Sequence, residues 1–271
     1  MNIKERVETL KKYSVVSEDN KYENKLSYSL LHTKDEKATV KVIRDNKEIN
    51  LNITSLDKFY QKPNTQKNGL INKKMGYIDP AQLKEGDIEK LMKKFKSTEG
   101  IIVDLRNYPS EFIPYLLGEY IVPEPSKFVE FSRQYPSLPG CFYYNDAYTG
   151  AGTMKQMGDN RKFPAYNGKV MILMDEGSMS CSEFTIMALR KSPNATVIGS
   201  PSIGADGNVV ELKLPGKISL NMSSIGVYTP EGGQTQRVGL KPDVECYPTV
   251  KGLQEGRDEL MEKAQELIIK K

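Results

Sequence analysis

Three serines at alternate positions are the residues of this chain best placed to do chemistry. Ser178, Ser180 and Ser182 lie between an unbroken apolar run, residues 170–174, and a stretch with helically spaced apolar residues. Such a run is typical of a strand buried on both faces, so the segment predicts a strand, a tight turn and a helix. A hydroxyl at the start of that helix would lie beside unpaired N–H groups that suit an oxyanion. The pattern makes Ser180 a candidate nucleophile, with the N–H of Cys181 beside it.

The same serines also fit a purely structural role. Glu183 follows Ser180 by three residues, which is the spacing of a capping box at a helix start. Helix caps are common, and the Gly-x-Ser-x-Gly sequence of many hydrolases is not present here. Cys181 is a weaker candidate nucleophile, because no histidine lies near it in sequence and a cysteine nucleophile usually has a base. From the residues alone, capping and catalysis both stay open.

The serine segment also resembles a known catalytic block. Residues 178–183, Ser-Met-Ser-Cys-Ser-Glu, resemble the Ser-Ala-Ser-Ala-Ser-Glu block of peptidase family S41, the tail-specific or C-terminal-processing serine peptidases and their tricorn-like relatives. Further matches keep the order of that family, and they lie at residues 75–79, 100–107, 197–204 and 238–243. The middle serine of the block is the nucleophile in that family. The resemblance thus implies that Ser180 is the nucleophile and that Cys181 lies at the oxyanion hole.

The resemblance implies an α/β fold, with a mixed, largely parallel sheet flanked by helices as in ClpP and crotonase. The residues agree, because a strand at 77–78, an amphipathic helix from Asp87 and a strand at 101–103 form a strand–helix–strand unit. Functional residues of such sheets gather at the carboxyl ends of the strands. Asn107 and Tyr108 follow one such end.

The segment expected to supply the second oxyanion donor differs from that of the resembled family. The resembled family has a Gly-Gly pair soon after its Asp-Leu-Arg strand end, but here Pro109, which has no N–H, lies in that region. The backbone N–H of Asn107 or Tyr108 is the candidate replacement. Asp104 and Arg106 are expected to form a structural ion pair.

The general base is where the resemblance fails. Ala205 stands where one branch of the family has its catalytic lysine, so a serine–lysine mechanism is not expected. The tricorn-like branch uses a histidine and a glutamate, but His32 does not match that histidine and Gln236 lies near the glutamate position. We expect a histidine outside these 271 residues to act as the base. Gly204, Asp206 and Gln236 are candidates for the substrate groove, with Asp206 ionised at neutral pH and serving mainly turn geometry.

The front of the chain predicts a small separate module. Residues 1–56 contain an amphipathic helix at 2–12, a short helix at 22–31 and a hairpin that turns at Asp45-Asn46. This segment resembles the carboxy-terminal half of a PDZ domain. The chain is therefore expected to begin inside a domain.

The rest of the chain predicts a linker and one large domain. Residues 57–70 are polar and are expected to be the linker, and residues 71–271 the peptidase core. Residues 133–165, rich in Tyr, Pro and Gly, predict a long loop that either covers a peptide groove or packs as an insertion. Residues 254–270 predict one terminal helix.

Composition excludes several classes of function. The chain of 271 residues is 38% hydrophobic and 27% charged, and its net charge of +4 is scattered without a basic stripe for nucleic acid. No apolar run is long enough to span a membrane, and the polar N-terminus predicts no signal peptide. The three cysteines lack metal-ligand spacing, so neither a metal nor a cofactor is expected.

The expected function is a serine endopeptidase that acts on peptides or unfolded proteins through an acyl-enzyme on Ser180. The resemblance also implies a location outside the cytoplasm. One alternative is an inactive peptide-binding relic of the same fold. Another is an acyl-CoA-type enzyme on a similar sheet, which would need a nucleotide pocket for which the sequence gives no support.

Overall fold

A computed structural model describes residues 3–12, 37–54 and 66–270 of the chain. The chain divides into two compact units, Met1–Thr65 and Gln66–Lys271. Each unit is described separately below.

The first unit contains one helix and one hairpin. Its elements are α1 (Ile3–Lys11), β1 (Lys37–Arg44) and β2 (Lys47–Thr54). The strands pair antiparallel, with Arg44 opposite Lys47, so Asp45 and Asn46 form a two-residue turn. Both turn residues have positive φ, 52° and 60°, which matches the twist of a tight hairpin and suits Asp and Asn. The predicted helix at 2–12 and the predicted hairpin are therefore confirmed.

Two further predictions for this unit concern residues that the structure does not describe. The helix predicted at 22–31 and His32 lie outside the described residues. The PDZ-like identity of the unit stays a prediction.

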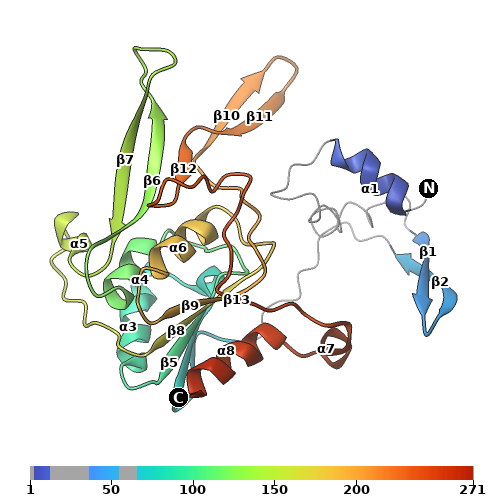
Figure 1. The fold of residues 1–271 in the computed structure, drawn as a ribbon, viewed down its shortest axis with the longest axis horizontal. Helices are drawn as coiled ribbons and strands as arrows, with labels where there is room; N and C mark the ends of the chain where they lie inside the picture. Colours follow the sequence, from blue (N-terminus) through green and yellow to red (C-terminus); the bar gives the residue numbers. More distant parts are fainter. Residues whose placement is uncertain (1–2, 13–36, 55–65, 271) are drawn as a thin grey trace. The chain divides into compact units, whose positions relative to one another are not determined.

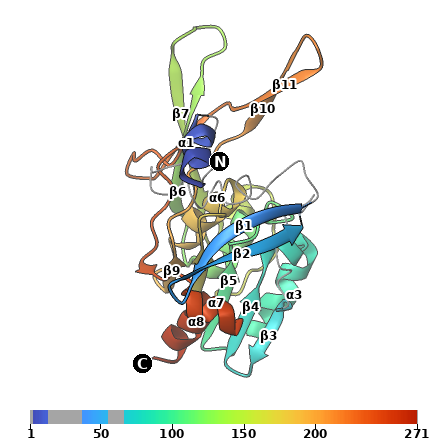
Figure 2. The same ribbon diagram turned by 90° about the vertical axis from the view of Figure 1, so that its right-hand side faces the viewer.

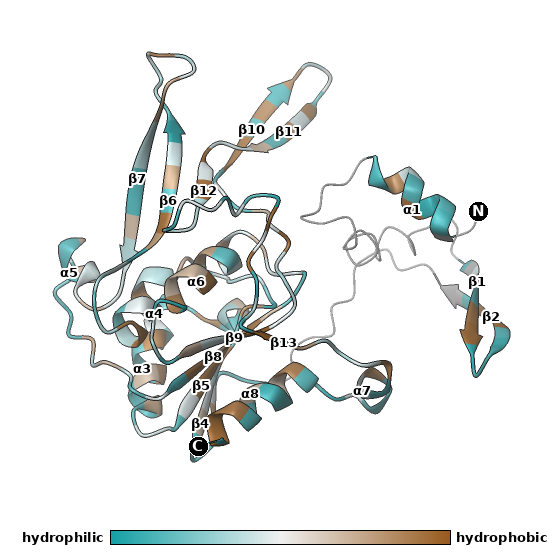
Figure 3. Cartoon of the chain, viewed as in Figure 1, coloured by the Kyte–Doolittle hydropathy of each residue, from teal (hydrophilic) through white to brown (hydrophobic). Residues whose placement is uncertain are grey.

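The second unit is built on a six-stranded sheet with the order β13-β9-β8-β5-β4-β3. The strands are β3 (Gly69–Asn72), β4 (Met75–Ile78), β5 (Gly100–Asp104), β8 (Lys169–Met174), β9 (Ala195–Gly199) and β13 (Val244–Glu245). All neighbours are parallel except β3, which pairs antiparallel with β4. The central strands β5 and β8 are largely hydrophobic (Figure 3), as burial on both faces requires. The predicted mixed, largely parallel α/β sheet is confirmed.

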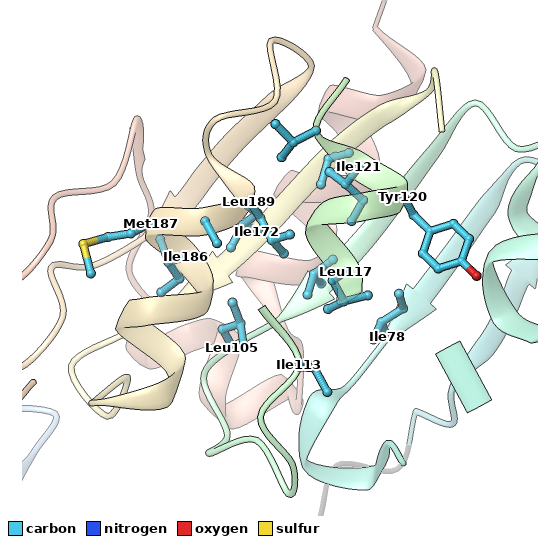
Figure 4. Close-up of a cluster of buried hydrophobic side chains, with 14 of the residues drawn as sticks. Ile78, Leu105, Ile113, Leu117, Tyr120, Ile121, Ile172, Ile186, Met187 and Leu189 are labelled. Carbon is cyan, nitrogen blue, oxygen red and sulfur yellow. The ribbon is translucent and has the colours of Figure 1, made fainter. Parts of the chain in front are cut away.

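Helices cover both faces of this sheet (Figure 1). The helices of this unit are α3 (Glu85–Phe95), α4 (Pro114–Ile121), α5 (Thr153–Gln156), α6 (Cys181–Leu189), α7 (Val250–Glu255) and α8 (Glu259–Ile269), with a short 3₁₀ helix, η2, at Pro80–Gln82. Side chains of α3, α4 and α6 share one core with the sheet, which includes Leu105, Leu117, Ile172 and Ile186 (Figure 4). Helix α8 packs on the other face through Leu260, Ala264 and Ile268.

Two hairpins project from the same end of this unit, as Figures 1 and 2 show. The first consists of β6 (Ser126–Gln134) and β7 (Phe142–Thr149), with β12 (Gly226–Tyr228) on the outer side of β6. The second consists of β10 (Val209–Leu214) and β11 (Ile218–Ser223). The prediction of a long loop at 133–165 is wrong, because the tyrosines of 142–149 form strand β7 and favour strand geometry.

Two predicted boundaries also need correction. The predicted linker at 57–70 extends too far, since β3 begins at Gly69 and pairs with β4. The predicted helix at 254–270 is two helices. Gly256 takes a left-handed conformation, φ 70°, which ends α7, and the Asp258 side chain accepts from Met261 N and starts α8.

Candidate active site

Ser180 lies at the junction of the sheet and helix α6, at the N-cap position. Its backbone has φ 48° and ψ −111°, a conformation that non-glycine residues rarely adopt and that costs on the order of 1–3 kcal/mol. Two acceptors share its N–H, the Ala205 carbonyl at 2.9 Å and the Glu183 carboxylate at 3.1 Å. Ser180 is therefore held in a strained turn between a strand and a helix, as the nucleophile of a sharp elbow would be.

The two flanking serines have a different role. Ser178 is fully buried, and its Oγ donates to the Leu105 carbonyl at 2.8 Å. Ser182 is also buried, and its Oγ donates to the Asn107 carbonyl at 3.4 Å. Both hydroxyls fasten the chain after β5 to the elbow. Their bonds explain why small hydroxyl residues stand on either side of Ser180.

Glu183 joins the elbow to a second loop. Its side chain is fully buried, and each carboxylate oxygen accepts two hydrogen bonds. Oε1 accepts from Ser202 Oγ at 2.5 Å and Gly204 N at 2.9 Å, and Oε2 from Ala205 N and Ser180 N, both at 3.1 Å. Burial nevertheless raises the pKa of Glu183. Glu183 thus binds the loop of residues 202–206, named here the carboxylate loop, to the start of α6.

The Glu183 carboxylate accepts from the Ser180 N–H at 3.1 Å, the contact that the capping-box spacing predicts. This contact uses the backbone of Ser180 and leaves its hydroxyl proton available to a base. The structural and the catalytic interpretations of Ser180 are therefore compatible.

Gly204 allows the carboxylate loop to approach its neighbours. It has φ 74°, and a Cβ at this position would lie 2.7 Å from Gly239 N. Its N–H points to Glu183 and its carbonyl accepts from Arg237 N at 2.7 Å. Any side chain here would be strained and would clash with backbone, so glycine fits a structural requirement of the site.

Gln236 supports the far side of the same loop. Its Nε2 donates to the Asp206 carbonyl at 3.0 Å and to the Ile225 carbonyl at 2.8 Å. Its Oε1 accepts from Val227 N at 3.3 Å. The structure therefore brings Gln236 to the neighbourhood of Asp206, while its side chain is occupied by backbone contacts.

Asp206 differs from the sequence-based expectation. It is only 5% exposed, and its Oδ1 accepts from Gly207 N at 2.8 Å while its Oδ2 has no hydrogen-bond partner among the described residues. Burial, and secondly the charge of Glu183, raise its pKa to about 7. Burial therefore shifts Asp206 toward its neutral form, which the expectation of an ionised aspartate did not include.

The candidate oxyanion donors lie around the elbow. Cys181 is the first residue of α6, where the N–H has no partner within the helix. Asn107 is fastened to α6 through Ser182, and Tyr108 next to it is 55% exposed. Burial raises the pKa of the Cys181 thiol, which disfavours the thiolate that a cysteine nucleophile needs.

The charged pair after β5 is structural, as predicted. The Arg106 guanidinium contacts the buried Asp104 carboxylate at 2.7 Å and Asp258 at 2.8 Å. Asp258 is the N-cap of α8, so the pair fixes the end of β5 to that helix. Within the described ranges, no group of three His, Cys, Asp or Glu side chains could hold a metal ion, and no helix is long and apolar enough to cross a bilayer.

The sequence did not indicate that the carboxylate loop donates hydrogen bonds to Glu183. Glu183 was predicted only as a cap partner, although it also binds Ser202, Gly204 and Ala205. These partners lie about 20 residues later, and no local pattern announces the contact. The unusual signal is a glutamate inside an otherwise apolar and small-residue helix, residues 181–189.

The fold and the serine elbow place the chain among α/β proteins with a site at the carboxyl ends of parallel strands. Residues 74–246 match the family model described as Peptidase family S41. The chain therefore belongs to peptidase family S41.

Individual similarities are more distant. A carboxy-terminal-processing protease of Bartonella bacilliformis is 32% identical over 75 residues, which are 28% of this chain and 17% of that protein. An uncharacterized protein of Chlamydia muridarum is 25% identical over 107 residues, 38% of this chain and 18% of that protein. The matched segments thus span less than a fifth of these curated relatives.

Solved structures show the same fold. A candidate peptidase from Parabacteroides merdae superposes with a TM-score of 0.63 at 20% identity, over 76% of this chain and 66% of that one. Mature CPAF complexed with lactacystin gives a TM-score of 0.59 at 12% identity, over 87% of this chain and 67% of that one. At these identities the likeness concerns the fold.

Proposed function

We propose that this chain is the catalytic part of a serine endopeptidase that forms an acyl-enzyme on Ser180. The observation that carries the proposal is the strained conformation of Ser180, φ 48° and ψ −111°, at the start of α6. Strain of this kind persists only where surrounding contacts fix it, and it clusters at functional sites. Membership of a peptidase family supports hydrolysis of peptide bonds as the reaction.

In the proposed mechanism, Ser180 Oγ attacks the scissile carbonyl carbon at the elbow. The N–H of Cys181, with that of Asn107 or Tyr108, stabilises the developing oxyanion, and the dipole of α6 adds to this effect. Gly204, Asp206 and Gln236 border the groove on the other side. The sequence predicts a histidine outside these 271 residues as the base.

The proposed substrate is a peptide or an unfolded protein. Hairpin β10–β11 begins at Val209, soon after Asp206, and supports this proposal by its uncovered apolar face. The cross-strand pairs on that face are Val210–Met222, Leu212–Leu220 and Leu214–Ile218, with each side chain at least 40% exposed. Their alternation with polar residues along β10 can be followed in Figure 3. An exposed apolar surface of this kind suits extended apolar segments of an unfolded chain.

A fluorophosphonate probe tests the nucleophile. It should label the chain once, and peptide mapping should locate the adduct on Ser180. Ser180→Ala should abolish labelling, and Ser224→Ala, which changes an exposed serine elsewhere, should keep it. An unlabelled but folded chain would instead support the inactive peptide-binding relic, an alternative favoured by Ala205 at the position of the family's lysine.

The location of the reaction is a further part of the proposal. The resemblance to tail-specific peptidases supports an extracytoplasmic site. Fractionation of cells that produce the native protein would check it, with recovery in the cytoplasmic fraction as the contrary result.

A further inference from the structure

The hairpin of β6 and β7 ends in a tip that carries exposed apolar side chains and no charge. We name residues 134–145 the aromatic tip, and none of them is charged. Its large apolar side chains are between 38% and 60% exposed: Tyr135, Leu138, Phe142, Tyr143 and Tyr144. The tip is the part of the hairpin that lies farthest from the sheet (Figures 1 and 2). Exposed apolar groups gathered at a protruding point are typical of an interaction site.

Backbone hydrogen bonds define the shape of the aromatic tip. Tyr135 N donates to the Cys141 carbonyl at 2.8 Å and closes the loop between the strands. Inside the loop, Leu138 N donates to the Tyr135 carbonyl at 3.1 Å, and Cys141 N donates to the Leu138 carbonyl at 3.0 Å, so two turns follow each other. The rings of Tyr135 and Tyr143 pack edge to face, with their centroids 5.6 Å apart. The exposed apolar side chains are therefore presented by a well-defined hairpin.

The apolar side chains of the tip lie on both faces of the hairpin. Successive strand residues face opposite sides, so Phe142 and Tyr144 lie on one face and Tyr143 on the other, where it contacts Tyr135. Each face exposes on the order of 300 Å² of apolar side chain, well below the roughly 800 Å² that each partner buries in a standard protein interface. A protein partner or a second copy of the chain would cover one face, whereas a lipid layer surrounds an inserted tip on all sides.

Positive charge is found at the same end of this unit, on the second hairpin. The outer half of β10–β11 contains Lys213 and Lys217, both exposed, and no acidic residue. Both hairpins project from this end (Figures 1 and 2). The acids of the first hairpin are paired, since Lys127 contacts Glu130 at 2.6 Å and Asp146 at 2.7 Å. This end of the unit therefore combines uncharged aromatic side chains with exposed lysines, which suits an anionic surface.

We propose that the aromatic tip inserts into the headgroup region of an anionic lipid bilayer, while the lysines of β10–β11 bind lipid phosphates. Tyrosine favours this region, because its apolar ring and polar hydroxyl match the boundary between acyl chains and water. Lysines near an anionic surface add electrostatic attraction. An apolar insertion and a basic patch together give reversible attachment of a protein to a membrane surface. The apolar face of β10–β11 is the opposite face from Lys213 and stays available to the proposed substrate.

The experiment measures sedimentation of the full chain with sucrose-loaded vesicles. Vesicles of equal parts of phosphatidylglycerol and phosphatidylcholine should bind the chain, and vesicles of phosphatidylcholine alone should bind it at least about tenfold more weakly. A double variant, Leu138→Ser with Phe142→Ser, should lower the partition coefficient for the anionic vesicles about tenfold or more. Leu253→Ser is the matched control, because Leu253 on α7 is 65% exposed and lies outside both hairpins, and it should not change the partition coefficient.

The lysines have an effect of their own. Lys213→Gln and Lys217→Gln should each weaken binding to the anionic vesicles about fivefold and leave binding to phosphatidylcholine unchanged. A dye on Cys141 reports the position of the tip. Cys141 is exposed, whereas burial raises the pKa of the Cys181 and Cys246 thiols, so an environment-sensitive thiol dye should label Cys141 first. The emission of that dye should shift to the blue on the anionic vesicles.

Three results would overturn the inference. They are a folded wild-type chain that binds neither kind of vesicle, a double variant that binds as the wild type does, and a dye on Cys141 whose emission does not shift on vesicles that bind the chain. A wild-type dimer in sedimentation velocity without lipid, lost in the double variant, would also overturn it and would assign the tip to a second copy of the chain. Circular dichroism of each variant checks that it is folded.

The inference is independent of the proposed nucleophile. Ser180→Ala should bind the anionic vesicles as the wild type does, although it should lose fluorophosphonate labelling. Failure of vesicle binding and failure of labelling are therefore separate results.

Discussion

The turn after β5 and the carboxylate loop both reach Ser180, but different chemistry holds them there. The turn after β5 is fastened by neutral hydroxyls, with Ser178 on Leu105 and Ser182 on Asn107. The carboxylate loop is fastened by a buried acid, Glu183, and carries a second one, Asp206. Neutral hydroxyls thus fasten one segment to the elbow, and a buried carboxylate fastens the other.

This difference bears on where an oxyanion could form. An oxyanion is stabilised by N–H groups and would be repelled by a nearby carboxylate. The turn after β5, which carries the candidate donors Asn107 and Tyr108, therefore suits an oxyanion better than the carboxylate loop.

The largest expected effect concerns Asp206 and stability. Its folded pKa, about 7, exceeds the ordinary value of 3.8, because burial disfavours the charged form. The stability that the neutral form of Asp206 contributes to the fold is therefore fully present below about pH 4 and is lost as pH rises through 7. Asp206→Asn should raise the free energy of unfolding by roughly 2–4 kcal/mol at pH 8 and change it little at pH 4, as measured by urea titration.

The control for this prediction is Asp87→Asn, an exposed aspartate on α3. As an exposed substitution, it should change the free energy of unfolding by less than about 0.5–1 kcal/mol. If Asp206→Asn raised the free energy of unfolding equally at pH 4 and pH 8, burial would not be raising the pKa of Asp206. That result would contradict the description of the carboxylate loop as a segment with a second buried acid.

Glu183→Ala tests the connection of the carboxylate loop to the elbow. Four donors would lose their buried acceptor, so the free energy of unfolding should fall by about 3 kcal/mol or more. Glu176→Ala removes an exposed acid with a single side-chain bond, to Ser200 at 2.9 Å, and should cost less than about 1 kcal/mol. Equal losses in the two variants, by urea titration at pH 7, would refute the role assigned to Glu183.

Loss of the hydroxyl contacts to the turn after β5 should reduce stability less than loss of Glu183. Ser178→Ala removes a buried hydroxyl that bonds both Leu105 O and Asp175 N, and about 1–2 kcal/mol of stability should be lost. Ser182→Ala removes one long bond and should cost less than about 1 kcal/mol. Thermal unfolding ranks the two, and a larger loss for Ser182 would contradict the assignment of contacts.

The smallest effect on stability is expected at the projecting hairpin. Leu212→Ser and Leu220→Ser change exposed side chains, so stability should stay within about 0.5 kcal/mol. KM for an unfolded protein substrate should rise several-fold, while labelling by the small probe should not change. An unchanged KM would remove the hairpin from the proposed substrate surface.

Much of the sheet could be predicted from the sequence, because its strands are continuous apolar runs. The runs at 101–103 and 170–174 lie in β5 and β8, and the spacing from Ile88 to Phe95 lies in α3. Helix α4 was not predicted, although Pro114 stands at its first turn and its apolar residues have helical spacing. The pattern there was available and was missed.

The hairpin of β6 and β7 could not be recognised as readily. In residues 142–149, all side chains except Ala147 and Thr149 are exposed, so no buried face imposes a regular alternation of polar and apolar residues. Without that alternation, the sequence does not distinguish a strand from a loop. Their pairing with β6, and that of β6 with β12 almost 100 residues away, is a tertiary contact that local sequence does not encode.

At the site, residue types were predictable but environments were not. The sequence indicated Ser180, Cys181, Asn107 and Gly204 as neighbours, and contacts through Glu183 and Ser182 connect their segments. It could not show that Asp206 is buried, because burial depends on how the loop folds against α6. It also could not show the positive φ of Ser180, since no local residue pattern here requires it.

The most direct test is to trap the acyl-enzyme. The chain is mixed with an activated peptide ester at pH 8 and quenched with acid within seconds, and the digest is examined by mass spectrometry. The account predicts one acyl adduct, on Ser180, that is missing in Ser180→Ala. An adduct on Cys181, or a folded chain that carries no adduct at all, would contradict the assignment of Ser180 as the nucleophile.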